Sequence, residues 1–75
     1  MSKEKPRFII YVSIAGRAPA IAGTAATLSS AIKQCEQAIA TAAEVYTRGY
    51  GDNPARDVWS VYDERDAVTR WKSKR

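Results

Sequence analysis

The side chains that could do bond-making chemistry are four clustered carboxylates and one thiol, namely Asp57, Asp63, Glu64, Asp66 and Cys35. Paired carboxylates can act as general acid and base, or they can hold a cation. Asp63, Glu64 and Asp66 fall in a predicted tight turn, where we expect them to be solvated and ionised, and their spacing does not fit a calcium-binding loop. The carboxylate cluster is therefore interpreted as a polar turn.

The numbers of cysteine and histidine residues limit the types of catalytic or metal site that the chain can form. Histidine is absent and Cys35 is the only cysteine, so zinc sites and cysteine–histidine pairs lack a usual member and no intramolecular disulfide can form. Cys35 falls on the apolar stripe of a predicted helix, where burial should leave an inert thiol. We expect no catalytic residue, metal or cofactor, and hence no enzyme.

Recognition chemistry is expected instead from aromatic and cationic side chains. Tyr11, Tyr62 and Trp71 are predicted to lie on the side of a sheet that a single helix cannot cover, and large exposed apolar patches mark interfaces. The predicted charged surround consists of Arg17, Arg48, Arg56 and Arg70, and Tyr50, between two glycines, can also reach a partner.

The elements that must position these residues are four strands and one helix. Strands are predicted at 7–15, 20–26, 57–62 and 67–71, the second at a sheet edge because its side chains are small. From Leu28 to Tyr46 the apolar residues recur at steps of four and three, which predicts a helix that begins after a Thr27 N-cap (Ser29 is the alternative) and ends at Gly49. The predicted fold is α+β, ββαββ, with one helix on one face of a mainly antiparallel four-stranded sheet.

The pairing of the last two strands decides which aromatic residues share a face. With Asp63–Asp66 as the turn, Tyr62 is expected opposite Ala67 and Val61 opposite Val68. The predicted core is then Trp59, Val61 and Val68, which leaves Val58, Tyr62 and Trp71, with Ile9 and Tyr11, on the uncovered face.

Charge and length complete the expectations. Seventy-five residues with 45% hydrophobic and 27% charged content predict one globular domain, 1–75, with basic tails at 1–6 and 72–75. The net charge of +4 is concentrated near the two ends, which can bind phosphate or simply solubilise the chain. No apolar run reaches the roughly 18 residues that span a membrane, and the single cysteine fits a cytoplasmic location.

Two segments resemble a pattern in small phage and mobile-element proteins. They are Ala26-Thr27-Leu28-Ser29-Ser30-Ala31-Ile32 and Val58-Trp59-Ser60-Val61-Tyr62-Asp63. Such proteins include inhibitors of host defence, among them anti-CRISPR proteins, so the resemblance implies blockade of a host defence complex. It covers about half of the chain and assigns no functional residue.

These observations predict a protein-binding module without enzymatic activity. Stacking of two uncovered sheet faces, giving a homodimer, is a second use of the same surface. The alternative is single-stranded nucleic-acid binding through the rings and the basic termini, although no ribonucleoprotein motif is present.

Overall fold

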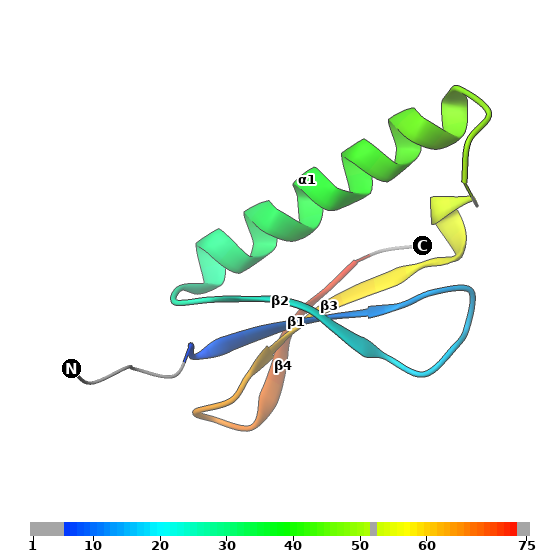
Figure 1. The fold of residues 1–75 in the computed structure, drawn as a ribbon. Helices are drawn as coiled ribbons and strands as arrows, with labels where there is room; N and C mark the ends of the chain where they lie inside the picture. Colours follow the sequence, from blue (N-terminus) through cyan, green and yellow to red (C-terminus); the bar gives the residue numbers. More distant parts are fainter. Residues whose placement is uncertain (1–5, 52, 74–75) are drawn as a thin grey trace.

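The protein, seen here in a computed structural model, consists of four strands and one long helix (Figure 1). The structure describes residues 6–51 and 53–73. The strands form one antiparallel sheet in the order β2-β1-β3-β4, so the α+β fold of order ββαββ is confirmed. Along the chain the elements are β1 (Phe8–Ser13), β2 (Ala20–Ala25), α1 (Leu28–Thr47), the 3₁₀ turn η1 (Pro54–Arg56), β3 (Val58–Asp63) and β4 (Val68–Lys72).

The helix α1 begins and ends where its local signals predict. The Thr27 hydroxyl accepts a hydrogen bond of 3.2 Å from a backbone N–H of the first turn. At the other end, the N–H of Gly49 donates to the carbonyl of Tyr46 at 2.9 Å and that of Tyr50 to the carbonyl of Val45 at 3.1 Å. This is the Schellman pairing, which requires positive φ at the residue after the cap, and Gly49 has φ 92°.

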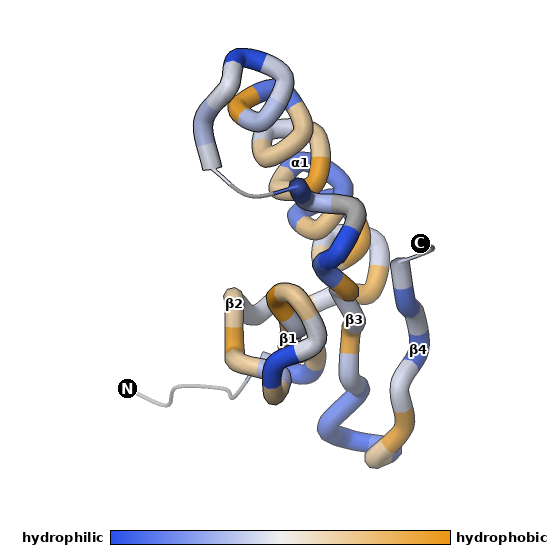
Figure 2. The backbone as a smooth tube through the Cα atoms, turned by 90° about the vertical axis from the view of Figure 1, so that its right-hand side faces the viewer, coloured by the Kyte–Doolittle hydropathy of each residue, from blue (hydrophilic) through white to orange (hydrophobic). Residues whose placement is uncertain are grey.

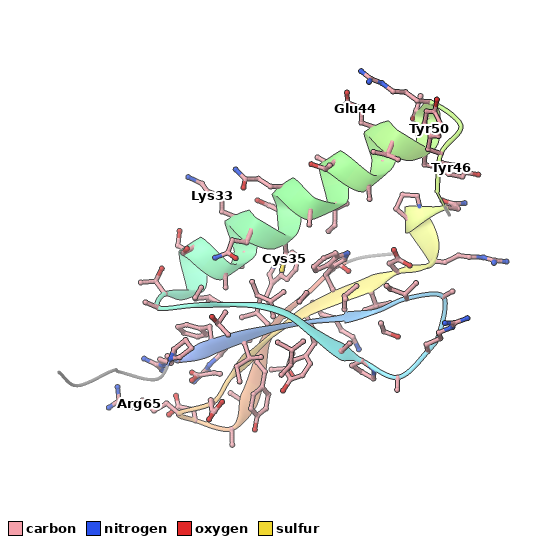
Figure 3. All side chains as sticks on the ribbon, viewed as in Figure 1. Lys33, Cys35, Glu44, Tyr46, Tyr50 and Arg65 are labelled. Carbon is pink, nitrogen blue, oxygen red and sulfur yellow. The ribbon has the colours of Figure 1, made fainter. Side chains whose placement is uncertain are left out.

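The core lies between α1 and one face of the sheet, called the helix face (Figure 2). In Figure 3, Cys35 points from α1 toward the sheet, whereas Lys33 and Glu44 point away from it. Cys35 on the helix and Val61 on β3 have no exposed surface, and Trp59 packs against this cluster. The buried apolar residues are Phe8, Ile10, Ala25, Ala31, Cys35 and Val61.

The helix is longer than the sheet beneath it. Its 20 residues span about 30 Å, whereas a six-residue strand spans about 20 Å. Figure 1 shows the C-terminal half of α1 rising away from the strands. Val45 and Tyr46 are therefore 41% and 45% exposed, and the prediction that the buried stripe continues to Tyr46 is wrong because no strand lies below it.

The predicted edge position of β2 is confirmed, and a tight turn connects it to β1. The N–H of Arg17 donates to the carbonyl of Ile14 at 2.9 Å. Between them Ala15 and Gly16 both have positive φ, 51° and 80°, as in a type I′ turn. β1 ends at Ser13, so Ile14 lies in the turn and its side chain is 49% exposed.

The turn of the β3–β4 hairpin lies further along the chain than predicted. Asp63 pairs with Val68 and Tyr62 with Thr69, so both strands lie one residue further along the chain than predicted and four residues form the loop. Val68 lies at the loop end of the hairpin, away from the packed cluster, and is 41% exposed. Its predicted place in the core is wrong.

A β-bulge then moves Trp71 to the other side of the sheet. Val61 pairs with Trp71, so Arg70 is an extra residue in β4 and every later side chain changes face relative to a regular ladder. Trp71 therefore shares the helix face with Val61 and packs against the buried cluster. The prediction that Trp71 lies on the uncovered face is wrong.

The structure describes only part of the predicted basic tails, 1–6 and 72–75. Residues 1–5 and 74–75 lie outside the described residues. Lys72, which was expected to begin the C-terminal tail, is the last residue of β4, and the N–H of Ser73 donates to the carbonyl of Trp59 at 2.7 Å. Within 6–51 and 53–73, no helix combines the length and apolarity needed to cross a membrane.

Candidate functional site

The sheet face opposite α1, called the open face, carries both predicted tyrosines. No helix or strand within residues 6–51 and 53–73 packs over it (Figures 1 and 2). The chain after Gly49 does not cross it either, because η1 packs against α1. By strand alternation and register, the open face consists of Ile21 and Thr24 from β2, Ile9, Tyr11 and Ser13 from β1, Val58, Ser60 and Tyr62 from β3, and Thr69 and Lys72 from β4.

Tyr11 and Tyr62 form the centre of the open face. Tyr11 pairs with Ser60 and Tyr62 with Ile9, so the two rings are diagonal neighbours on adjacent strands. Their centroids are 6.4 Å apart and their planes meet at 77°, an edge-to-face contact. Such contacts are worth about 0.5–1.5 kcal/mol beyond the area they bury. The pair therefore holds both half-buried rings in a fixed arrangement.

Two shallow hollows adjoin the tyrosine pair. The first is lined by Tyr11, Tyr62, Pro19, Ser60 and Thr69. The second continues along the face toward Ser13, Val58, Lys72 and Ser73. Hydroxyl groups thus border an apolar floor, a combination that offers both apolar area and hydrogen bonds to a docking surface.

Three cations gather at the Ser13 end of the open face and are called the basic end: Arg17, Arg56 and Lys72. Lys72 lines the hollow that contains Ser13, and Arg56 lines a further hollow that also contains Ser13. The Ser13 hydroxyl donates to the backbone carbonyl of Arg17 at 2.5 Å. Asp57 lies nearby and accepts a hydrogen bond from the β1–β2 turn, so the local charge is net positive.

The remaining predicted site residues lie elsewhere. Arg48 pairs with Glu44 at 2.9 Å near the C-terminal end of α1, and the Nε of Arg70 donates to Asp63 on the helix face at 3.1 Å. Tyr50 is 68% exposed, and Figure 3 shows it at the far end of α1. The structure thus brings Tyr11, Tyr62, Arg17 and Arg56 to one surface and separates Arg48, Tyr50, Arg70 and Trp71 from it.

A network of ion pairs around Asp63 holds the loop end of the β3–β4 hairpin. Asp63, expected in an exposed turn, is fully buried. Arg7 donates from Nε to its Oδ1 at 3.0 Å and from Nη2 to its Oδ2 at 2.9 Å, while Arg70 approaches the same Oδ2. Asp66 pairs with both arginines. Two cations and two anions therefore balance one another.

The network favours the ionised form of Asp63. Hydrogen bonds from Arg7, with help from Arg70 and the backbone N–H of Asp66, hold the pKa of Asp63 well below its usual range, although burial acts in the opposite direction. A carboxylate held ionised in this way is a poor proton carrier near neutral pH. Strand alternation could have revealed the burial of Asp63, because Asp63 follows Val61 by two residues and so lies on the same, buried face.

Cys35 is fully buried among core side chains. Burial, and to a lesser extent the charge of Glu36, raises the pKa of its thiol. In the part of the chain that the structure describes, no three His, Cys, Asp or Glu side chains are placed to hold a metal ion.

Comparisons of this chain with protein families, with curated proteins and with solved structures find no match. The surfaces of the chain are therefore the basis on which its function is inferred.

Proposed function

We propose that this chain is a small, non-enzymatic protein-binding module that docks through its open face. The observation that supports this proposal is the one-sided cover of the sheet: α1 packs on the helix face, and the Tyr11–Tyr62 pair lies on the other. One helix can cover only one face of a four-stranded sheet. The second face is left without a covering element, and here that face carries large rings.

The tyrosine pair is the expected energetic centre of the interface. Tyrosine is enriched among hot-spot residues, and a buried ring contributes about 150–250 Å². Both rings are already half-buried within the chain, so together they supply only a minor part of the about 800 Å² that each partner contributes to a standard interface. Ile9 and Val58, which flank the rings on the same face, extend this apolar centre.

The charge of the open face favours an acidic protein partner. The face itself contains Lys72 and no carboxylate, and Arg17 and Arg56 border the same end. Two copies stacked face to face would bring like charges together, whereas an acidic surface would be attracted. Protein is favoured over single-stranded nucleic acid because rings at 77° do not form the parallel stacking platform that successive bases use.

Blockade of a host protein is one activity such a module can perform, and it is the activity that the phage resemblance implies. That resemblance stays a prediction. The physical requirement is only that the open face cover a functional surface of the partner.

The proposal is tested by capture followed by matched variants. Immobilised protein is used to capture a partner from host lysate, and the dissociation constant is then measured for the wild type, Tyr62→Ala and Tyr50→Ala. We expect Tyr62→Ala to weaken binding by about 30-fold, the effect of a hot-spot residue, and Tyr50→Ala, at the far end of α1, to change it by less than about twofold.

Equal effects of the two variants would contradict the proposal. Titration with a single-stranded oligonucleotide at two salt concentrations tests the alternative, because phosphate binding gives a steep salt dependence. Tight, salt-sensitive binding that requires Tyr62 would replace the protein partner with a nucleic acid.

A further inference from the structure

The two outer edges of the sheet differ in how they are protected. Both edge strands contain a bulge, but β4 also carries Arg70 and Lys72, and charged side chains discourage pairing with another strand. β2, with the sequence Ala-Ile-Ala-Gly-Thr-Ala, has no charged residue and no proline within it. Only β2 therefore combines an unpaired edge with side chains that do not repel a second strand.

The β2 edge is also exposed and partly apolar. Ala20, Ala22 and Thr24 are exposed, and Ile21 is 66% exposed, although a strand residue of this type is usually covered. β2 pairs with β1 on one side only, so the backbone N–H and C=O groups on its outer side have no strand partner in the described sheet. Exposed backbone groups beside an exposed isoleucine are what an added strand would bury.

We propose that β2 is a self-pairing edge, to which a second copy of this chain adds its own β2 antiparallel across a two-fold axis. The two strands are then identical in length and uncharged, and the two sheets become one continuous sheet. With the axis between Ala22 and Gly23, all six residues of β2 pair, and Ile21 lies opposite Thr24 of the second copy on the open face. The inference is independent of the proposed function, because Tyr11 and Tyr62 stay uncovered in such a dimer.

Charge favours this arrangement over stacking of the open faces. Each chain carries +4, and Arg17 lies four residues before Ile21. Antiparallel pairing about this axis places the two Arg17 residues on the order of 35 Å apart, beyond the Debye length of about 8 Å at physiological salt. Stacked open faces would instead bring two basic ends against one surface.

The side chains of α1 that lie beside β2 allow a second copy of the chain to approach. Gln34, Gln37 and Thr41 line the hollow between α1 and β2, together with Ala22. Gln34 also donates from Nε2 to the backbone carbonyl of Thr24 at 3.4 Å. These side chains are polar and uncharged, so two copies can approach without ionic repulsion between their helices.

The test uses two threonines that occupy equivalent places on opposite edges. Thr24 on β2 pairs with Ile9, Ile9 pairs with Tyr62, and Tyr62 pairs with Thr69 on β4, so both threonines lie in one row of the open face. Thr24→Lys places two like charges at the proposed junction, whereas Thr69→Lys adds the same charge to the edge that already carries lysine.

Sedimentation velocity from low micromolar to near-millimolar protein measures the dimer directly. We expect the wild type and Thr69→Lys to dimerise with dissociation constants within about twofold of each other. Thr24→Lys should weaken the dimer by about tenfold or more, since a lysine on an edge strand discourages pairing with a second strand. Circular dichroism confirms that each variant is folded, and Ile21→Ser, at an already exposed position, provides a second variant that should also weaken the dimer.

A wild type that stays monomeric over the whole range would overturn the proposal. So would equal weakening by the two lysine variants. A dimer that is lost in Tyr62→Ala but kept in Thr24→Lys would show that the open faces associate instead.

Discussion

Replacing Trp71 by alanine separates a packing role from a binding role. Trp71 lies on the helix face opposite Val61 and packs against the core, so its loss should destabilise the isolated chain. A fully buried tryptophan costs about 3–5 kcal/mol when truncated, and for this half-buried ring we expect about 2 kcal/mol. That is a large fraction of the roughly 4–11 kcal/mol expected for 75 residues. The melting temperature should fall by about 8–16 °C.

Urea unfolding followed by far-ultraviolet circular dichroism measures this cost without relying on tryptophan emission. Tyr50→Ala is the matched control, because that ring is 68% exposed, and it should change the free energy of unfolding by less than about 0.5 kcal/mol. If Trp71→Ala were no more destabilising than Tyr50→Ala, Trp71 could not be part of the core and the bulge in β4 would be refuted.

Three further predictions concern the buried carboxylate, the first turn and the thiol. Because the pKa of Asp63 is lowered in the folded state, its ionised form contributes stability that is fully present above the unfolded pKa of about 3.9 and is lost as the pH falls toward the folded value. The difference in the free energy of unfolding between wild type and Asp63→Asn, measured with urea, should therefore shrink between pH 6 and pH 2.5. A difference that stays constant would argue against the ion pairs. Ala15→Gly should raise the free energy of unfolding by about 1 kcal/mol, because alanine is strained at φ 51°, and a loss of stability would show that the turn has another conformation. Cys35 should react with a thiol reagent only as fast as the chain opens, so labelling at the rate of a free thiol in native protein would contradict its burial.

The helix could be predicted because its signals are local. A threonine cap, a stripe at steps of three and four, and Gly49 each act within a few residues, and Thr27 and Gly49 lie where those signals place them. The order of elements followed from the same reasoning. The open-face positions of Tyr11 and Tyr62 were also predictable, since strand alternation places them and no irregularity intervenes between their paired residues.

The β4 register could not be predicted because a distant contact accompanies it. Arg70 is the extra residue of the bulge, and its side chain reaches Asp63, which Arg7 also holds from the other end of the chain. Sequence separation of 56 residues between Arg7 and Asp63 leaves no local pattern to detect. One additional residue was enough to move Trp71 across the sheet and change its expected role.

The unequal lengths of α1 and the sheet predict a gradient of hydrogen exchange along the helix. Amide protons around Ala31 and Cys35 lie in helical turns that pack against the sheet, so their exchange should require opening of the whole domain. Amides around Val45 and Tyr46 have only their own turn and the Gly49 cap to retain them, so they should exchange through small local openings. The last turns of α1 should therefore melt before the rest, with the sheet still intact.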